Sequence, residues 1–286
     1  MKISIRTSAN KEENINKARE QAQDNPKIKS VIIGYADITF DDKYKLNGAQ
    51  IRERLDEEKK VYVQLPFYLQ DPEKNNGVAR QEILHPVNSQ TRNALNNAVL
   101  DQFKSGTKDT LEYDLGDKVT FKPTVTTEMV EVFSNSKFDN VGKARIGFGD
   151  WMLHGVNIKP YSSDNPEHKT GLHINLAKSP KPAVDENKQP IYNADGTRKM
   201  DYQTIFMPLT TEAYEELNST VLAAYETAKK EMAKNASWGI GVPKPRTEEN
   251  KSVEKDNVQD ANVDYSDMDL SEFEDLDLTA SNGISR

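Results

Sequence analysis

The chain has 286 residues, enough for two domains of ordinary size and an extension. It has no cysteine, which excludes a disulfide framework, a thiolate zinc site and a cysteine nucleophile. The chain has 46 acidic and 38 basic residues, a net charge of −8. Residues 246–286 contain 12 of the acidic residues and 4 of the basic ones, so the whole net charge lies at this end. The other 245 residues contain 34 of each kind and are neutral overall. A neutral body is compatible with local basic patches that bind nucleic acid.

The first part of the chain alternates between predicted strands and helices. Apolar and β-branched residues predict strands over residues 2–6, 31–40, 44–51, 61–65 and 82–84. Residues 11–25 are rich in Glu, Lys, Gln and Ala and predict a polar surface helix. A second helix is predicted over 90–104, with Ser89 as its N-cap.

The second part repeats this order of elements. Strands are predicted over residues 128–133, 144–148, 151–158 and 172–176. A helix begins at Thr210 or Thr211 and is expected to reach about Lys234. Between them, residues 180–202 predict an inserted hairpin arm with Asp195-Gly196 at its turn.

Two short sequences also return in the same order. Residues 46–52 (LNGAQIR) match 153–159 (LHGVNIK), and the segment that begins at Pro86 matches the one at Pro208, 122 residues later. A duplicated domain is the simplest explanation, and Trp151 is expected in the core like its counterpart Tyr44. The predicted organisation is α+β, with one domain over 1–105, a second over 106–242 that carries the arm, and a disordered acidic tail over 243–286.

The tail is too polar to offset the entropy cost of ordering it, and only 35% of the whole chain is hydrophobic. Large hydrophobic side chains nevertheless interrupt its carboxylates, namely Tyr265, Met268, Leu270, Phe273, Leu276 and Leu278. This pattern favours a segment that docks on a partner protein over a solubilising spacer.

Three segments of the first part resemble the stage V sporulation protein G (SpoVG, septation protein) family. They are ADITFD at 36–41, VYVQLP at 61–66 and ILHPVNSQTR at 83–92. The resemblance covers about 30–105, and a looser one covers about 127–230. It implies a small antiparallel sheet with a C-terminal helix, binding to DNA and RNA, and pairing as a homodimer. Two copies in one chain then form an intramolecular pseudo-dimer, with a homo-oligomer as the alternative.

In the family, an apolar strand ends in Met-Pro and is followed by a basic Ser-Lys-Arg segment, which the resemblance implies is a nucleic-acid contact. The first part has Phe67-Tyr68-Leu69 at this place, and the second has Lys178-Ser179-Pro180-Lys181. Exposed aromatic rings can stack on unpaired bases, and core packing is the alternative for them. The candidate nucleic-acid contacts are Phe67, Tyr68, Arg80, Arg92, Lys178, Lys181, Arg198 and Lys199. For the cations of the arm, the alternative is a set of solvated charges.

Metal, cofactor and catalytic motifs are not expected. His154, His168 and His173 lack the spacing of metal ligands, and His85 is expected to serve structure ahead of Pro86. The chain contains no phosphate-binding loop, nucleophile elbow, dinucleotide fingerprint or EF-hand loop, so an enzyme is not expected. It also lacks the apolar core of a signal peptide and any long apolar run, so we expect a soluble, cytoplasmic protein.

A body followed by an acidic, hydrophobic-tipped tail is typical of single-stranded DNA-binding proteins, whose tails recruit replication and repair proteins and compete with DNA. The first hypothesis is therefore sequence-tolerant, salt-sensitive binding of single-stranded DNA with a partner-recruiting tail. The second is a SpoVG-like regulator that binds specific DNA or RNA sites. The third is a scaffold protein that binds no nucleic acid.

Overall fold

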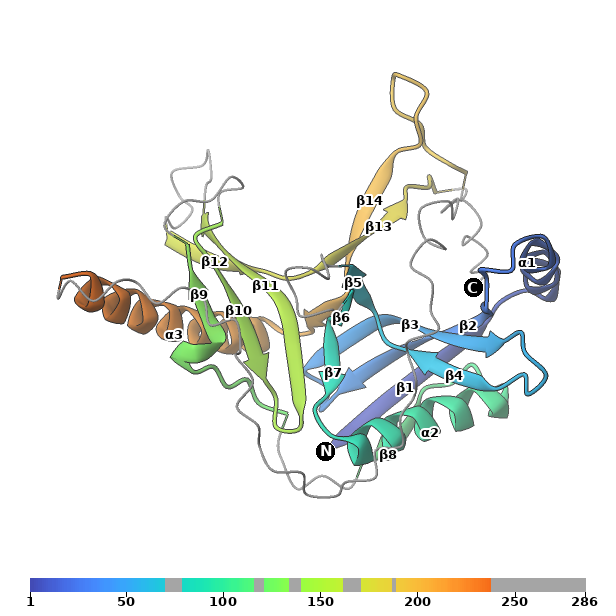
Figure 1. Ribbon diagram of the computed structural model, residues 1–286, viewed down its shortest axis with the longest axis horizontal. Helices are drawn as coiled ribbons and strands as arrows, with labels where there is room; N and C mark the ends of the chain where they lie inside the picture. The colour runs from blue at the N-terminus through green and yellow to red at the C-terminus, as the bar shows by residue number, and fades with distance from the viewer. Residues whose placement is uncertain (70–78, 116–120, 134–139, 162–170, 187–188, 238–286) are drawn as a thin grey trace.

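A computed structural model describes residues 1–69, 79–115, 121–133, 140–161, 171–186 and 189–237, which form two halves joined side by side (Figure 1). The first half ends at residue 115, and the second begins at residue 121. The predictions for the tail over 243–286 and for His168 lie outside these residues. Within the described part, no helix is both long and apolar enough to cross a membrane.

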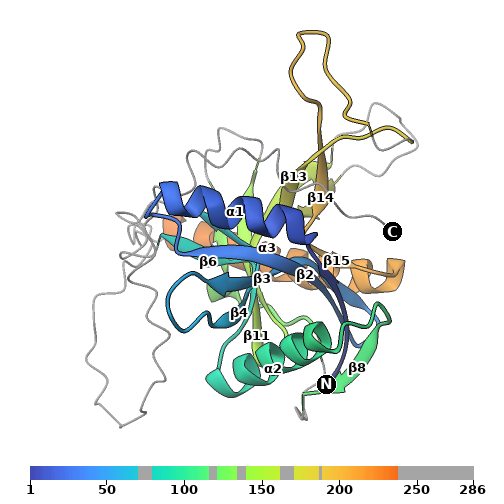
Figure 2. The same ribbon diagram turned by 90° about the vertical axis from the view of Figure 1, so that its right-hand side faces the viewer.

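Sheet one has six antiparallel strands in the order β15-β3-β2-β1-β8, with β4 also paired to β3. These strands are β1 (Lys2–Ala9), β2 (Ser30–Phe40), β3 (Tyr44–Arg54), β4 (Val61–Gln64), β8 (Leu111–Asp114) and β15 (Phe206–Pro208). Helix α2 (Ser89–Ser105) packs against β1 and β4, and α1 (Glu12–Asp24) packs against β2. The two helices lie on opposite sides of the strands (Figure 2).

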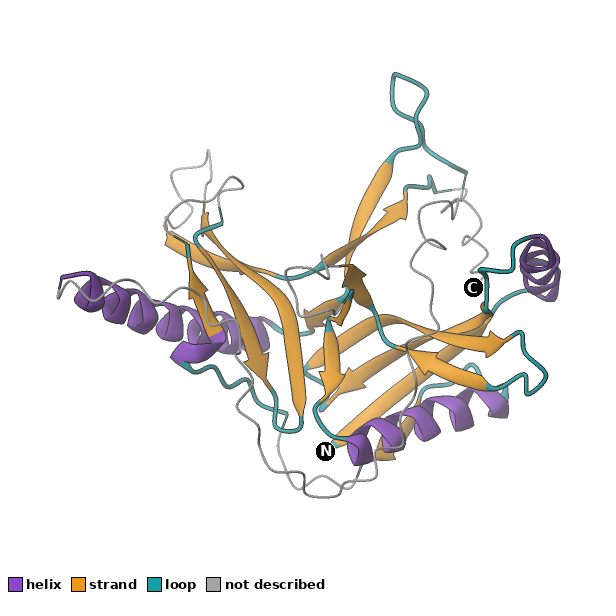
Figure 3. Cartoon of the chain, viewed as in Figure 1, coloured by secondary structure: helices purple, strands orange, loops and turns teal. Residues whose placement is uncertain are grey.

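Sheet two has five antiparallel strands in the order β12-β11-β10-β9, with β7 also paired to β11. These strands are β7 (Leu84–Pro86), β9 (Val130–Val132), β10 (Gly142–Gly147), β11 (Trp151–Tyr161) and β12 (Gly171–Asn175). A 3₁₀ turn (Thr127–Met129) precedes β9 and replaces the start of the strand predicted there. Helix α3 (Thr211–Ser237) covers one face of the sheet (Figure 3). The predicted α+β class is confirmed.

The two halves exchange a strand. β7 belongs to the first half but pairs with β11 in sheet two, and β15 belongs to the second half but pairs with β3 in sheet one. The registers of the two exchanges are equivalent, since Pro86 pairs with Trp151 as Pro208 pairs with Tyr44. Each exchanged strand leads directly into the helix that covers its own half, so both halves depend on both exchanges.

The repeated sequence, Leu46-Asn47-Gly48-Ala49 in β3 and Leu153-His154-Gly155-Val156 in β11, forms a β-bulge that hydrogen-bonds to the exchanged chain. In β3 two residues, Asn47 and Gly48, lie opposite the single residue Asp37 of β2, and β11 has the same bulge at His154 and Gly155. The bulge requires a left-handed backbone, and the two glycines have φ values of 79° and 73°. The N–H of Asn47 donates to the carbonyl of Ile205 at 2.8 Å, and that of His154 donates to Ile83 at 2.7 Å.

An aromatic cluster fills the junction between the halves. The Phe121 ring stacks on Phe40 and on Phe148, with 4.5 Å between centroids in both pairs. Trp151 lies edge-on to Phe40 at 5.0 Å and is 1% exposed, while Tyr44 is fully buried. The core positions predicted for Trp151 and Tyr44 are therefore confirmed, and the two halves share one hydrophobic core.

The helices begin and end close to their predicted bounds, with one difference at α2. Its N-cap is Asn88 and not Ser89, because the Asn88 side chain accepts a hydrogen bond from the N–H of Thr91 at 2.8 Å. Ser89 is the first helical residue. The buried face carries Leu95 and Val99, both fully buried, as the helical spacing predicts.

A short hairpin precedes each exchanged strand. In the first half β5 (Phe67–Leu69) pairs with β6 (Arg80–Glu82), and in the second half β13 (Lys178–Pro182) pairs with β14 (Met200–Thr204). Both hairpins close with the same hydrogen bond: the N–H of Ile83 donates to Pro66 at 2.8 Å, and that of Ile205 donates to Ala177 at 3.0 Å. The arm predicted as an insertion over 180–202 is thus a longer form of a hairpin that the first half also has.

Candidate nucleic-acid interface

One face of sheet two is covered by α3, and every second residue of β10 points to the opposite face, which is exposed. A Cβ placed on Gly142 would lie 3.0 Å from the ring of Tyr225 in α3. Because side chains alternate along a strand, Lys143 and Arg145 point away from α3, and both are exposed.

Polar side chains of β11 and β12 continue this outer face. Asn157 pairs with both Lys143 and Asn175, and Lys159 pairs with His173. We call the resulting surface the basic face, which consists of Lys143, Arg145, Asn157, Lys159, His173 and Asn175. Glu131 of β9 lies opposite Lys143. None of the three cations forms an ion pair with another residue that the structure describes.

The corresponding face of sheet one carries compensated charges. Asp37 lies opposite the bulge of sheet one, and Arg145 occupies the equivalent position in sheet two. The carboxylate of Asp37 pairs with Lys45 at 2.8 Å. Lys2 pairs with Glu112 at 2.7 Å. Two lysines of this face are therefore neutralised by carboxylates, and Asp37 stands where Arg145 supplies a cation in sheet two, although the two sheets share their backbone plan.

Aromatic rings border the basic face. Tyr68 reaches across from the first half, so that its ring lies 3.4 Å from a Cβ placed on Gly155, and it remains 36% exposed. Its partial burial raises the pKa of its hydroxyl. At the far end of β11, Tyr161 is 40% exposed and lies edge-on to His173, with centroids 5.5 Å apart. Partly exposed rings beside cations can stack on bases while phosphates contact the cations.

A histidine pair joins the two halves next to this surface. The Nε2 atoms of His85 in β7 and His154 in β11 lie 3.1 Å apart. Nδ1 of His85 lies 2.9 Å from the carbonyl of Pro86, which requires a proton on Nδ1 and leaves Nε2 to accept from His154. Burial, with the charges of His85 and Arg145, lowers the pKa of His154 to about 4. Among the described residues no three potential metal ligands come together.

Besides Tyr68, three of the predicted contact residues lie on or beside the first hairpin, namely Phe67, Arg80 and Arg92. The guanidinium of Arg80 lies over the ring of Phe67, 4.9 Å from its centroid. Arg92, in the first turn of α2, binds both carboxylate oxygens of Glu82, and its side chain is only 22% exposed. The charge of Arg92 is thus already paired within the protein.

The other predicted cations lie on the second hairpin, which rises away from the body (Figure 1). Lys178 and Lys181 belong to β13, and Lys181 pairs in register with Asp201. Arg198 lies opposite Tyr192 in a bridge further along the arm, next to Lys199. Two tyrosines of this arm are among its most exposed side chains, Tyr192 at 61% and Tyr202 at 69%.

Sequence reasoning did not single out the cations of the basic face. The signal was present, because Lys143 and Arg145 alternate with small or apolar residues, and Asn157 and Lys159 alternate with Val156 and Ile158. Alternation with a period of two shows which side chains of one strand share a face. It cannot show that side chains of different strands lie on the same face until the register between the strands is known.

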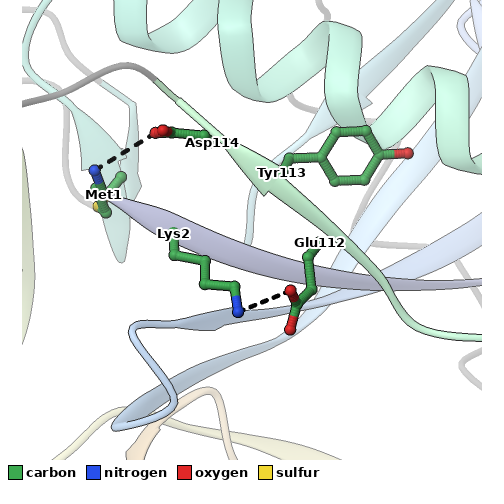
Figure 4. A pocket seen from close by; sticks show the side chains of 5 residues that line it. All are labelled: Met1, Lys2, Glu112, Tyr113 and Asp114. Carbon is green, nitrogen blue, oxygen red and sulfur yellow. Dashed lines mark ion pairs between the residues drawn. The ribbon is translucent and has the colours of Figure 1, made fainter.

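An open pocket of about 470 Å³ lies at the edge of sheet one, between β1 and β8 (Figure 4). Its charges pair with one another: the amino group of Met1 lies 3.7 Å from Asp114, and Lys2 pairs with Glu112. The pocket therefore offers no unpaired charge for a ligand.

Comparison with known families identifies part of the first half. Residues 17–105 match the SpoVG family model. The SpoVG match begins within α1 and ends with α2, so it contains β7, the strand given to sheet two. No curated protein and no solved structure matches the chain.

Proposed function

We propose that this chain is a nucleic-acid-binding protein without catalytic activity, and that it prefers single-stranded DNA. The observation that carries the proposal is the basic face, where Lys143, Arg145 and Lys159 project from neighbouring strands and form no ion pair with any residue that the structure describes. The match of residues 17–105 to the SpoVG family model supports binding to nucleic acid, because the resemblance to this family implies binding to DNA and RNA. Lys178, Lys181, Arg198 and Lys199 on the arm would add phosphate contacts.

The preference for a single strand rests on the aromatic side chains. Tyr68 and Tyr161 border the basic face, and each base stacked on such a ring contributes roughly 1–3 kcal/mol without regard to sequence. A duplex keeps its bases stacked on one another, so it cannot use these rings without being opened. Sequence-tolerant binding follows.

We further propose that the second half is a diverged SpoVG-like copy, so that one chain supplies both halves of a dimer-like unit. The reciprocal strand exchange with equivalent registers supports this proposal. The charge difference between the two sheet faces implies that the unit binds asymmetrically, through its second half.

The acidic tail is proposed to recruit replication or repair proteins through Met268, Leu270, Phe273, Leu276 and Leu278. Residues 246–286 carry a net charge of −8, which is complementary to the basic face, so the tail would also compete with DNA. Removal of the chain from Lys244 onward would then tighten DNA binding and abolish partner recruitment. Unchanged DNA affinity would refute the competition.

The decisive experiment is a titration of labelled single-stranded DNA, duplex DNA and RNA over a salt series. We expect the single strand to bind most tightly and the logarithm of its affinity to fall linearly with that of salt, by about 0.7 per neutralised phosphate. Arg145→Ala/Lys159→Ala should weaken binding roughly ten-fold and reduce that slope. The matched control Lys2→Ala/Arg6→Ala removes the same charges from the other sheet and should bind as the unchanged protein does.

Other outcomes select the alternatives. Tight binding of particular duplex or RNA sites would favour a SpoVG-like regulator, which the family match also supports. Indifference to every nucleic acid would leave a scaffold protein and overturn the proposal.

A further inference from the structure

The tip of the arm holds a tyrosine beside an arginine. Tyr192 lies opposite Arg198, and the backbone hydrogen bonds that flank this pair join its neighbours in the chain at 2.8 and 2.9 Å. The pair is therefore a non-hydrogen-bonded one, in which side chains come closest across an antiparallel ladder. The tip, residues 191–199, extends beyond both sheets, which leaves it accessible to a large ligand (Figure 1).

The guanidinium of Arg198 has no partner among the described residues. Its Nε is buried and forms no hydrogen bond, and no ion pair within the described part of the chain reaches this side chain. Asp195, at the turn of the arm, is occupied by Thr197, whose N–H and hydroxyl donate to its Oδ1 at 2.9 and 2.6 Å. A partly buried cation without a counter-charge is unfavourable, so the tip favours an anion from outside the protein.

A second exposed ring shares this face of the arm. Tyr202 follows Arg198 by four positions along the extended segment that contains β14, and an even spacing puts both side chains on one side. Four positions span about 13 Å. Tyr192 is 61% exposed and Tyr202 69%, the two largest exposed fractions among the large hydrophobic side chains that the structure describes. We call the surface of Tyr192, Arg198 and Tyr202 the arm face.

The opposite face of the arm has a different character. Lys199 and Asp201 alternate with the residues of the arm face and therefore point to the other side. Asp201 lies opposite Lys181 in the register of β13 and β14, which places a carboxylate beside the cations. Ala183, whose N–H donates to the carbonyl of Lys199 at 2.9 Å, is only 1% exposed. The cations of this side are thus partly compensated, unlike Arg198.

We propose that the arm face is a second contact surface for single-stranded DNA, on which Tyr192 and Tyr202 stack on bases and Arg198 binds a phosphate of the same strand. The inference rests on the proposed function and extends it from the basic face to the arm. Only unpaired bases can stack on exposed rings, and a guanidinium beside the rings neutralises the backbone that joins those bases. Of the two adjacent cations, Arg198 makes the principal contact and Lys199 a minor one.

The test separates bases from phosphates and one face of the arm from the other. The probes are a fluorescein-labelled oligothymidylate of about 20 nucleotides and an abasic strand of the same length. Tyr192→Ala/Tyr202→Ala removes both rings, and Tyr192→Phe/Tyr202→Phe keeps them without their hydroxyls. Arg198→Ala has Lys199→Ala as its matched control, because the two residues are neighbours in the chain and point to opposite faces.

We expect Tyr192→Ala/Tyr202→Ala to bind the oligothymidylate roughly five-fold more weakly or worse, with unchanged affinity for the abasic strand. The phenylalanine variant should bind both strands as the unchanged protein does. Arg198→Ala should weaken binding of both strands and reduce the salt slope by about 0.7, which corresponds to one phosphate. Lys199→Ala should have a clearly smaller effect on both.

Two outcomes would overturn the arm face, provided that the unfolding midpoints of the variants are unchanged. One is undiminished binding of the oligothymidylate by Tyr192→Ala/Tyr202→Ala. The other is an equal loss in Arg198→Ala and Lys199→Ala, which would show a diffuse attraction by charge. If Arg145→Ala/Lys159→Ala still weakened binding in either case, the proposed function would stand. Failure of the unchanged protein to bind either strand would overturn both.

Discussion

The two strand exchanges share a backbone and differ in side chains. Where β15 meets β3, Asn47 donates from its amide to the carbonyl of Thr204, and Asp37 pairs with Lys45. Where β7 meets β11, the corresponding positions hold the His85–His154 pair and Arg145, which forms no ion pair within the described part of the chain. Both exchanges have the same bulge, the same register and the same anchoring hydrogen bonds, because these features hold the two halves together. The side chains on the outer faces carry no such constraint, so one exchange became neutral and the other basic.

The largest expected effect comes from the ring that serves both halves. Phe121→Ala removes the stacking on Phe40 and on Phe148 and leaves a cavity at the junction. We expect the free energy of unfolding to fall by about 3–5 kcal/mol. Thermal or denaturant unfolding followed by circular dichroism measures it.

The same experiment tests whether the halves form one cooperative unit. A shared core predicts a single transition for the unchanged protein and for Phe121→Ala. Two separated transitions would show that the halves unfold independently, contrary to the mutual dependence inferred from the strand exchange.

The second expected effect is a pH dependence confined to one exchange. The pKa of His154 is lowered to about 4 from its ordinary value of 6.5, so the folded protein holds this histidine neutral where the unfolded chain protonates it. Stability is therefore fully present above pH 6.5 and is lost as the pH falls toward 4. The loss is on the order of 3 kcal/mol.

The matched variant for this pH dependence is His85→Met/His154→Asn, which copies Met207 and Asn47 of the other exchange. Its unfolding free energy should lack most of the decline between pH 6.5 and 4. An equal decline in both proteins would assign the pH dependence to other groups.

The smallest effect compares the two bulge glycines directly. Gly48→Ala and Gly155→Ala each force a Cβ into a left-handed conformation, which costs about 1–2 kcal/mol of stability. Because the Cβ of either variant meets no neighbour closer than 3.4 Å, the two losses should agree. A clearly larger loss at one position, measured by denaturant titration, would show that the bulges are not equivalent.

Local sequence predicted most of the elements. The apolar spacing of Leu95 and Val99 identifies the buried face of α2, because a helix presents every third or fourth residue to one side. The repeated sequence around Gly48 and Gly155 indicated a shared architecture before the bulges were known. The N-cap was displaced by one residue, since Asn88 and Ser89 are both good caps and only backbone geometry selects between them.

The candidate site was less accessible from sequence. Tyr68 was predicted, but its contact with Gly155 joins residues from different halves. Arg92 was predicted as a phosphate contact from its place at a helix start, and its pairing with Glu82 could not be read from the sequence. The cations at 143, 145 and 159 are separated along the chain, and they form a surface only through strand pairing.

The sequence by itself determined that this chain is α+β, that two short segments recur in it in the same order and that its negative charge is concentrated at one end. These properties follow from residue spacing and composition, which act over a few neighbours at a time. Only the tertiary structure decided which sheet receives each three-residue strand, because β7 and β15 are too short to specify a partner alone. The bulge N–H groups and the shared aromatic core select that partner. The strand exchange brings Tyr68 and the histidine pair to the basic face.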